Sequence, residues 1–224
     1  MKLLFISENV PAGMYEILKQ KYDIRLLKPD GRLDTPVCTH ADMLVGALDG
    51  RIIVTRSYYG DNGELFSGVV PVMTDEEQGR EYPNDILLNF IDVKTAVVGL
   101  EKHISNYAKA KKVINVKQGY ARCSTLVGQN FAVSADAGIL SALSALGYDT
   151  LLISAGGVEL PGYDHGFIGG ASFSDGDDVY FFGSLSYHKD GERIKKFLHK
   201  HGAEIYELDD TPPIDLGGAV IVKN

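Results

Sequence analysis

The sequence predicts a closed ring of five small α/β units, a five-bladed α/β propeller built from ββαβ repeats. Two observations predict it: a hairpin-like pattern recurs along the chain, and the two chain ends together supply one further unit. A ring closed by pairing its last segment with its first leaves no sheet edge exposed, which is the physical reason why propellers close in this way.

Each copy of the recurring pattern has a polar entry, an apolar run, a Gly or Asn, and a second apolar run. The four longer copies begin at His40, Tyr82, Ala121 and Tyr163, and a shortened copy begins at Pro212. In the longer copies, one residue stands four positions before the Gly or Asn: Asp42, Asp85, Ser124 and His165. Apolar runs joined by turn residues are typical of β-hairpins, so each copy predicts a hairpin.

A helix and a further strand are expected after each hairpin. Residues 136–147 and 190–202 have apolar residues at helical spacing and end in glycine, and strands 149–154 and 203–208 follow them. Weaker helices are expected near 63–68 and 105–110, the second followed by strand 112–117. The chain begins with strand 2–7, helix 13–22 and strand 23–28, the three pieces that the C-terminal copy lacks.

These elements predict a single domain with five units. Their expected bounds are 38–80, 81–119, 120–161, 162–208, and 212–224 together with 1–28. The alternative is an open, doubly wound sheet, but hairpins dominate here, whereas such a sheet alternates strands with helices. The sequence contains neither GxGxxG nor GxxxxGK[ST], so no nucleotide cofactor is predicted.

Composition limits the classes of partner. The formal net charge of −8 argues against nucleic-acid binding, which needs a basic surface, and is compatible with a small cationic ligand. No apolar run approaches the length of about 20 residues that crosses a membrane. Two cysteines do not make a disulfide scaffold, and the N-terminal apolar stretch is interrupted too early for a signal peptide. We therefore expect a cytoplasmic protein, and the sequence predicts no oligomeric state.

The hairpin entries, together with GYDHGFIGGAS (162–172) and GSLSYHKDGERIKKFL (183–198), resemble the pentein fold of the guanidino-group-modifying enzymes, and specifically an uncharacterised bacterial family of that superfamily. The resemblance implies a catalytic carboxylate in an early unit, which Asp85 matches, and a histidine in the fourth unit, which His165 matches. It also implies a nucleophilic cysteine in the last unit, where residues 212–224 contain none. The ribosome anti-association factor of eukaryotes and archaea is a pentein without enzyme activity, so the fold does not decide the function.

If the first strand of each unit lines a central channel, side-chain alternation sorts the candidates into two faces. The more polar face, our preferred channel lining, carries His40, Asp42, Asp85, Arg122, Ser124, Tyr163, His165 and Asp215. The other face carries Ala41, Asn84, Cys123 and Asp164. Two interpretations stay open for the polar face: an ion-pair ring of Arg122 with Asp42 and Asp85 that holds the units together, or a carboxylate pocket for a guanidinium.

The candidate catalytic residues are His165, Asp85 and Cys123, and the candidate substrate-binding residues are His40, Asp42, Asn84, Arg122, Ser124, Asp164 and Asp215. One hypothesis is a hydrolase or transferase acting on a guanidino or related C–N compound, with the Cys123 thiolate as nucleophile and His165 as general acid and base. The alternative is a non-catalytic pentein that binds a small ligand or a macromolecule. A weaker third is a metal-dependent hydrolase using His40, Asp42 and His165, although no metal motif is predicted.

Overall fold

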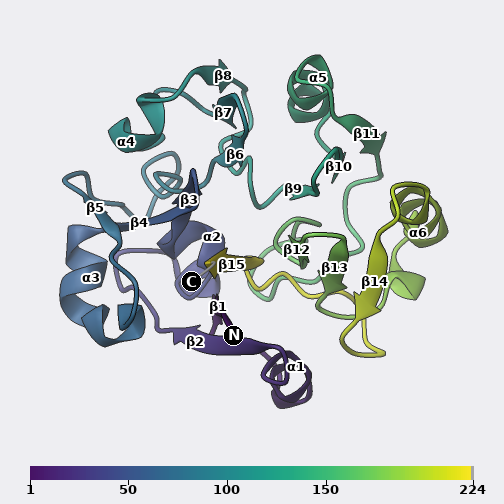
Figure 1. Ribbon diagram of the computed structural model, residues 1–224, viewed down its shortest axis with the longest axis horizontal. Coiled ribbons are helices and arrows are strands. Elements are labelled where there is room, and N and C mark those ends of the chain that lie inside the picture. The colour runs from purple at the N-terminus through teal and green to yellow at the C-terminus, as the bar shows by residue number, and fades with distance from the viewer. Residues whose placement is uncertain (223–224) are drawn as a thin grey trace.

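The computed structural model describes residues 1–222 as five three-stranded sheets set in a ring, with helices around the outside (Figure 1). Lys223 and Asn224, with which the last predicted unit ends, lie outside the described residues. The predicted five-bladed α/β propeller is therefore confirmed.

Every sheet has an inner strand antiparallel to the middle strand, and an outer strand parallel to the middle one. Four sheets are each built from one stretch of chain: β3 (Gly46–Leu48), β4 (Arg51–Thr55) and β5 (Val72–Thr74); β6 (Ile91–Val93), β7 (Ala96–Gly99) and β8 (Val113–Asn115); β9 (Thr125–Val127), β10 (Phe131–Ser134) and β11 (Asp149–Leu152); β12 (Ser172–Asp175), β13 (Asp178–Phe181) and β14 (Glu204–Glu207).

Helices connect the middle strand to the outer one, because parallel neighbours need a crossover connection. These helices are α1 (Ala12–Leu18), α3 (Arg56–Asn62) followed by the 3₁₀ turn η2 (Gly63–Phe66), α4 (Asn106–Lys109), α5 (Ala137–Ala145) and α6 (Gly191–Lys200), the last preceded by η3 (Leu185–Tyr187). Asp136 is the N-cap of α5, because its carboxylate accepts a hydrogen bond from the Ile139 amide at 2.8 Å.

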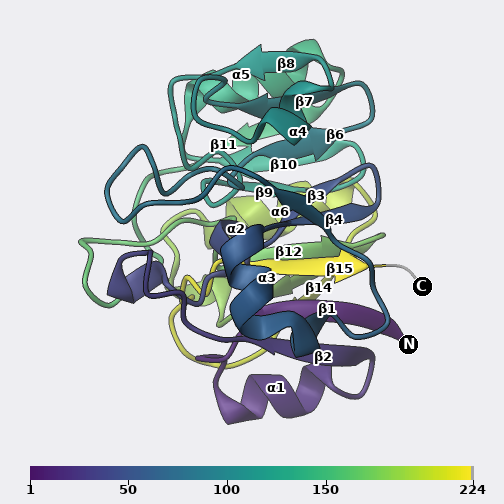
Figure 2. The same ribbon diagram turned by 90° about the vertical axis from the view of Figure 1, so that its left-hand side faces the viewer.

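The fifth sheet joins the two ends of the chain. β15 (Ala219–Val222) pairs antiparallel with β1 (Lys2–Ser7), which pairs parallel with β2 (Tyr22–Leu27). Leu3 lies opposite Val222 and Ile6 lies opposite Ala219. Figure 2 shows the two strands side by side with both termini at the same end of the molecule. The predicted closure of the ring is thus confirmed.

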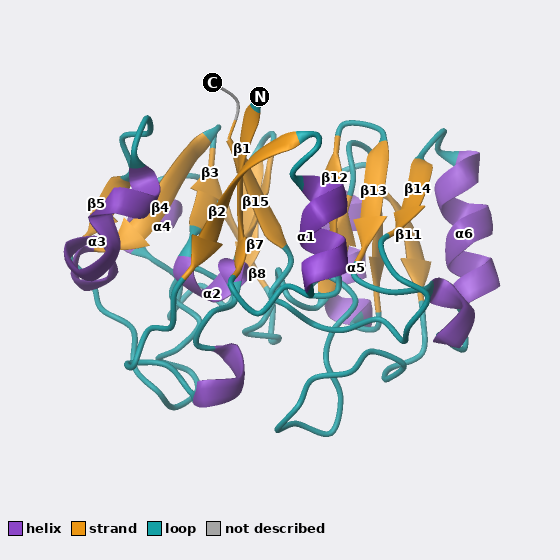
Figure 3. Cartoon of the chain, turned by 90° about the horizontal axis from the view of Figure 1, so that it is seen from below, coloured by secondary structure: helices purple, strands orange, loops and turns teal. Residues whose placement is uncertain are grey.

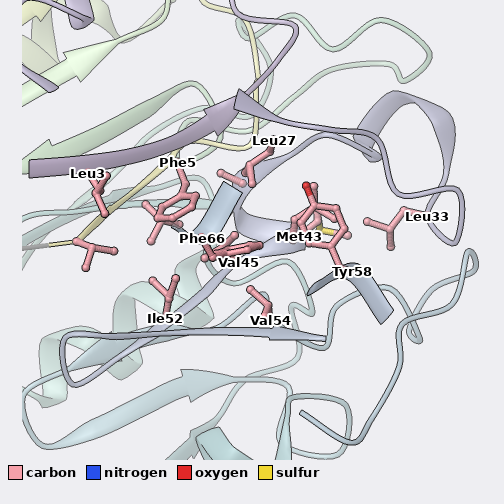
Figure 4. Close-up of a cluster of buried hydrophobic side chains, with 14 of the residues drawn as sticks. Leu3, Phe5, Leu27, Leu33, Met43, Val45, Ile52, Val54, Tyr58 and Phe66 are labelled. Carbon is pink, nitrogen blue, oxygen red and sulfur yellow. The ribbon is translucent and has the colours of Figure 1, made fainter. Parts of the chain in front are cut away.

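The apolar core lies between neighbouring sheets. Figure 4 shows one such cluster, where Phe5 of β1 faces Val54 of β4 across the ring of Phe66. Phe5 and Phe66 stack with ring centroids 5.3 Å apart, and Tyr58 meets Phe66 edge-on. Because the apolar side chains fill the wedges between the sheets, polar groups gather where the inner strands converge on the axis.

The segments that lead into the inner strands are not strands, which corrects the prediction. Residues 41–44 form a short helix, α2 (Ala41–Leu44), closed by a bond from the Val45 amide to the Ala41 carbonyl, and the Ser124 amide bonds the Tyr120 carbonyl in a helical turn. Together with η1 (Thr35–Val37) they lie on the end of the ring opposite the termini (Figure 3). Alternation between two faces therefore does not apply to the entry residues.

The residues that stand four positions before the Gly or Asn of each unit do not occupy equivalent positions in the structure either. Asp42 lies four residues before β3 begins, but Ser124 directly precedes β9. Asp85 lies six residues before β6 and His165 seven before β12. The entry loops differ in length, and only the paired strands keep a common geometry. Asp215, four residues before β15, is the candidate that shares the position of Asp42.

Candidate functional site

A central channel runs between the five inner strands. It encloses a cavity of about 350 Å³ that extends from Gly128, at the hairpin end of β9, to Arg122 at the entry end. Its walls include residues from all five inner strands, among them Ala47, Asp92, Thr125, Ser172 and Val220. Half of the residues predicted to line the channel lie together at its entry end, namely His40, Asp42, Arg122 and Asp215.

Arg122 closes the channel at that end. Its guanidinium donates to the Val45 carbonyl at 3.2 Å and to the Ala219 carbonyl at 2.8 Å, and its backbone amide donates to the Asn89 side chain at 2.8 Å. A Cβ added at Gly169 would lie 2.4–2.6 Å from backbone oxygens of residues 122, 123 and 125, so only glycine fits there. Arg122 thus ties four entry segments together through its side chain and its backbone amide, and Gly169 brings in the fifth.

We call this assembly the axial plug; it comprises His40, Asp42, Val45, Asn89, Arg122, Cys123, Gly169, Gly170 and residues 215–219. The predicted ion-pair ring of Arg122 with Asp42 and Asp85 was wrong, because Arg122 ties the units together through neutral carbonyl and amide oxygens. Among the described residues, no ion pair joins Arg122 to Asp42 or Asp85. The carboxylate of Asp42 is bonded by Cys123, and that of Asp85 by Tyr120.

Cys123 lies inside the plug with its side chain 4% exposed. Its thiol donates to Oδ2 of Asp42 at 2.7 Å and accepts a hydrogen bond from the Asn89 amide at 3.0 Å. Burial raises the pKa of the thiol well above its ordinary value, and the charge of Asp42 raises it further. The thiol is therefore a protonated hydrogen-bond donor. The expectation that Cys123 and Asp42 lie on opposite faces was wrong, because helical turns bring them together.

His40 and Asp215 form a second buried pair, with 3.6 Å between Nδ1 and Oδ1. The Asp215 carboxylate accepts from the backbone amides of Phe167 at 2.8 Å and Gly217 at 3.0 Å. Burial raises the pKa of Asp215 to about 6 and lowers the pKa of His40. A Cβ on Gly170 would lie 1.9 Å from Oδ1 of Asp215. Asp215 therefore anchors the fourth entry segment to the last one.

Asp85 lies outside the plug, in a cluster of acidic and aromatic residues. Its Oδ2 accepts from the Tyr120 hydroxyl at 2.5 Å, whereas its Oδ1 is buried without a hydrogen-bond partner. Burial raises the pKa of this carboxyl, and the negative charge of Asp34 raises it further. The Gln78 amide donates to the Asp85 carbonyl at 2.9 Å and fixes the backbone beneath the carboxylate.

The Tyr120 ring, whose hydroxyl bonds this carboxylate, packs against two other aromatic rings. The Tyr120 ring lies 5.5 Å from that of Tyr82 and 6.2 Å from that of Phe167, measured between centroids. Tyr163, 48% exposed, donates to Asp34 at 2.9 Å. We call the set Asp34, Tyr82, Asp85, Tyr120, Tyr163 and Phe167 the acidic–aromatic mouth. It joins four loops at the entry end and lies next to the plug, since the Phe167 amide donates to Asp215.

The remaining predicted residues lie apart from one another. His165 is exposed, contacts the Gly166 carbonyl at 2.9 Å, and meets the Phe167 ring edge-on at 6.0 Å. Within residues 1–222 it makes no hydrogen bond or ion pair with Asp85 or Cys123. Asn84 and Asp164 are exposed, and Ser124 is buried with its hydroxyl unpartnered. The structure therefore gathers His40, Asp42, Arg122, Cys123 and Asp215 but not the expected histidine and cysteine pair.

Sequence reasoning missed Asn89, Asp34 and Tyr120 as members of these sites, and it missed Gln78, which holds the backbone of Asp85. Asn89 had a detectable signal, because it stands among apolar residues where the other units carry glycine, and a buried amide needs partners. Loop geometry brings the Tyr120 hydroxyl into contact with Asp85 and the charge of Asp34 near it, and no local sequence pattern predicts either. In the described chain, no three His, Cys, Asp or Glu side chains are arranged to hold a metal ion, and no helix has the length and apolarity to cross a membrane.

Comparison with known proteins places the chain in a family. No curated protein matches the chain. A solved structure of a dimethylarginine dimethylaminohydrolase variant, in adduct with S-methyl-L-thiocitrulline, is similar over 93% of this chain and 92% of that one, at 14% identity and a TM-score of 0.55. That likeness shows the pentein fold.

A structure of unliganded AgrE is similar over 69% of this chain and 36% of that one, at 10% identity, but its TM-score of 0.30 is too low to support an argument. The model of a family of unknown function, DUF6873, matches residues 5–220. Because that match spans nearly the whole chain, the protein belongs to the DUF6873 family, and its fold is that of the penteins.

Proposed function

We propose that this protein binds a small cationic ligand, a guanidinium or an amine, at the acidic–aromatic mouth, and that it does so without cysteine chemistry. The observation that carries the proposal is the Asp85 carboxylate, because the residue is 4% exposed and one of its oxygens is unpartnered while the other accepts from the Tyr120 hydroxyl. An unpartnered buried carboxylate oxygen is costly, and a cationic N–H donor would satisfy it.

The surroundings of Asp85 favour a cation over an anion. Asp34 adds a second carboxylate, close enough to act on the pKa of Asp85. The faces of Tyr82, Tyr120 and Phe167 offer negative quadrupoles, which attract guanidinium and ammonium groups within about 6 Å. A guanidinium also presents parallel N–H donors that match a carboxylate. Binding would require the Tyr120 hydroxyl to share or release Asp85.

The geometry does not favour the alternative of a thiol-dependent hydrolase or transferase. Cys123 is buried and protonated, its thiol is directed at Asp42, and residues 212–224 contain no cysteine. A nucleophilic thiol needs a lowered pKa and access to substrate. The dimethylaminohydrolase activity in the name of the similar structure belongs to that protein.

Calorimetric titration with arginine, agmatine and methylguanidine tests the binding. Asp85→Asn keeps the shape of the side chain and removes its charge, so affinity should fall about tenfold or more, as for other charge-assisted hydrogen bonds of about 1.5–3 kcal/mol. Asp149→Asn is the matched control, because it removes the same charge from an exposed carboxylate that bonds Lys200. Equal affinity in wild type and Asp85→Asn would exclude the mouth as the site.

A parallel assay of ammonia, urea and citrulline-type products tests the absence of thiol chemistry. We expect no turnover from wild type or from Cys123→Ala. Turnover that the wild type shows and Cys123→Ala lacks would contradict the proposal and restore the enzyme hypothesis.

A further inference from the structure

We propose that the central channel is a second binding site, for a small monocarboxylate whose carboxylate meets Arg122 and Thr125. The site lies on the hairpin side of the axial plug, whereas the acidic–aromatic mouth lies at the entry end. It involves none of the residues of the mouth, so its test is independent of the test of the proposed function.

Arg122 supplies the positive charge. A guanidinium has five N–H donors, and two of the nitrogens of Arg122 each make one bond to a carbonyl, Val45 or Ala219. The other donors have no acceptor within residues 1–222, although the side chain lines the cavity. Oxyanions are the preferred partners of guanidinium groups. The floor of the channel therefore has donors available for one.

Thr125 supplies a neutral donor beside that charge. It is 4% exposed and lines the cavity, and its hydroxyl has no hydrogen-bond partner. The two serines of the neighbouring strand differ, because the hydroxyl of Ser172 donates to the Ile168 carbonyl at 2.6 Å and that of Ser174 to the Val127 carbonyl at 2.7 Å. A buried hydroxyl without a partner is costly, and the carboxylate of a ligand beside it would accept its hydrogen bond.

The cavity indicates the size and charge of this ligand. At about 350 Å³ it is at the lower end of small-molecule pockets, which span about 300–1,000 Å³. The walls combine strand backbone with apolar side chains such as Leu126 and Phe173, which suit a short hydrocarbon body. Asp92 also lines the wall, and Asp42 lies close enough beneath to act on Arg122. Because a single guanidinium faces these carboxylates, a doubly charged phosphate is disfavoured and a monoanion is the largest charge that the site can accept.

The test titrates the protein with sodium butyrate and uses sodium chloride at the same ionic strength as the reference. Calorimetry and backbone amide chemical shifts report the binding. Inorganic phosphate and methylguanidine are comparison probes. Arg122→Met would remove the charge, but it also removes bonds that hold the plug. Thr125→Val is the decisive variant, because the hydroxyl it removes has no partner in the fold. Thr150→Val makes the same change on β11, outside the channel, and is the control.

We expect saturable butyrate binding that shifts the amides of β9 and β15, and an affinity about tenfold or more lower in Thr125→Val than in wild type or Thr150→Val. Absence of saturable butyrate binding, or equal affinity in the two variants, would overturn the proposal. So would shifts confined to the entry loops, or phosphate binding more tightly than butyrate.

Discussion

Cys123→Ala tests the role assigned to the buried thiol. Asp42 is 1% exposed, its Oδ1 has no hydrogen-bond partner, and its Oδ2 accepts from the thiol at 2.7 Å. Removing that donor leaves a buried carboxylate unpaired, which costs about 1–3 kcal/mol. Loss of the buried sulfur adds about 1 kcal/mol. The expected loss in the free energy of unfolding is therefore about 2–4 kcal/mol. Cys123→Ser keeps a donor and should lose about 1 kcal/mol.

Urea unfolding and thermal melts measure these losses. At about 2–4 °C per kcal/mol for a chain of this size, the melting temperature of Cys123→Ala should fall by about 4–16 °C. Alkylation adds an internal comparison, since Cys38 is only partly buried. A thiol reagent should label Cys38 in the native protein and Cys123 only on unfolding.

Two results would refute this reasoning. One is a loss below about 0.5 kcal/mol in Cys123→Ala, the range of ordinary surface substitutions. The other is labelling of native Cys123 as fast as Cys38. A double-mutant cycle with Asp42→Asn separates the pair from its surroundings, because contacting residues show coupling of about 0.5–3 kcal/mol and independent ones do not.

Three further predictions follow from the plug. Gly169→Ala should destabilise the fold by about 3 kcal/mol or more because its Cβ would meet three backbone oxygens, whereas Gly13→Ala, in α1 with open space around it, should stabilise by about 0.5–1 kcal/mol; comparable urea midpoints would contradict this. Arg122→Met, which breaks both carbonyl bonds across the axis, should cost about 2–4 kcal/mol, and a melt like that of the wild type would show that the plug holds without it. Burial raises the pKa of Asp215 from 3.8 to about 6, so the folded chain binds that proton more tightly than the unfolded chain. Protonation of Asp215 therefore adds about 3 kcal/mol to the free energy of unfolding. This contribution is fully present below about pH 4 and is lost as the pH rises through about 6. Asp215→Asn should abolish that loss in urea titrations from pH 4 to 7, and a wild-type minus variant difference independent of pH would contradict the assignment; His40, with a lowered pKa, titrates in the opposite sense in both proteins.

The fold was predictable because its signals are local and repeated. Turn residues between apolar runs predicted the hairpins, and helical spacing predicted α5 and α6 close to their observed bounds, Ala137–Ala145 and Gly191–Lys200. The complementary chain ends predicted closure of the ring. The connection from β4 to β5 was less well predicted, since a short helix near 63–68 was expected and α3 begins at Arg56.

The candidate site was predictable only in part. Counting along the units found Asp42, Arg122 and Asp215, because polar residues at the entries converge wherever the inner strands meet. Which groups touch depends on backbone turns of three or four residues, and these leave no periodic signal. The thiol of Cys123 therefore reaches Asp42 although strand alternation predicted opposite faces. His165 matched by position but is exposed, since a longer loop precedes β12.

The sheet shared by the two chain ends has a consequence for biosynthesis. Four sheets can assemble as soon as their own stretch of chain leaves the ribosome, but β1, α1 and β2 are made first and their inner neighbour β15 after every other strand. Until then Leu3 and Phe5 lack Val220 and Val222, with which they share a core cluster. Domains fold as units while synthesis proceeds at about 5–20 residues per second. Of the five sheets, the one whose middle and outer strands are translated before all the others is thus the one completed last.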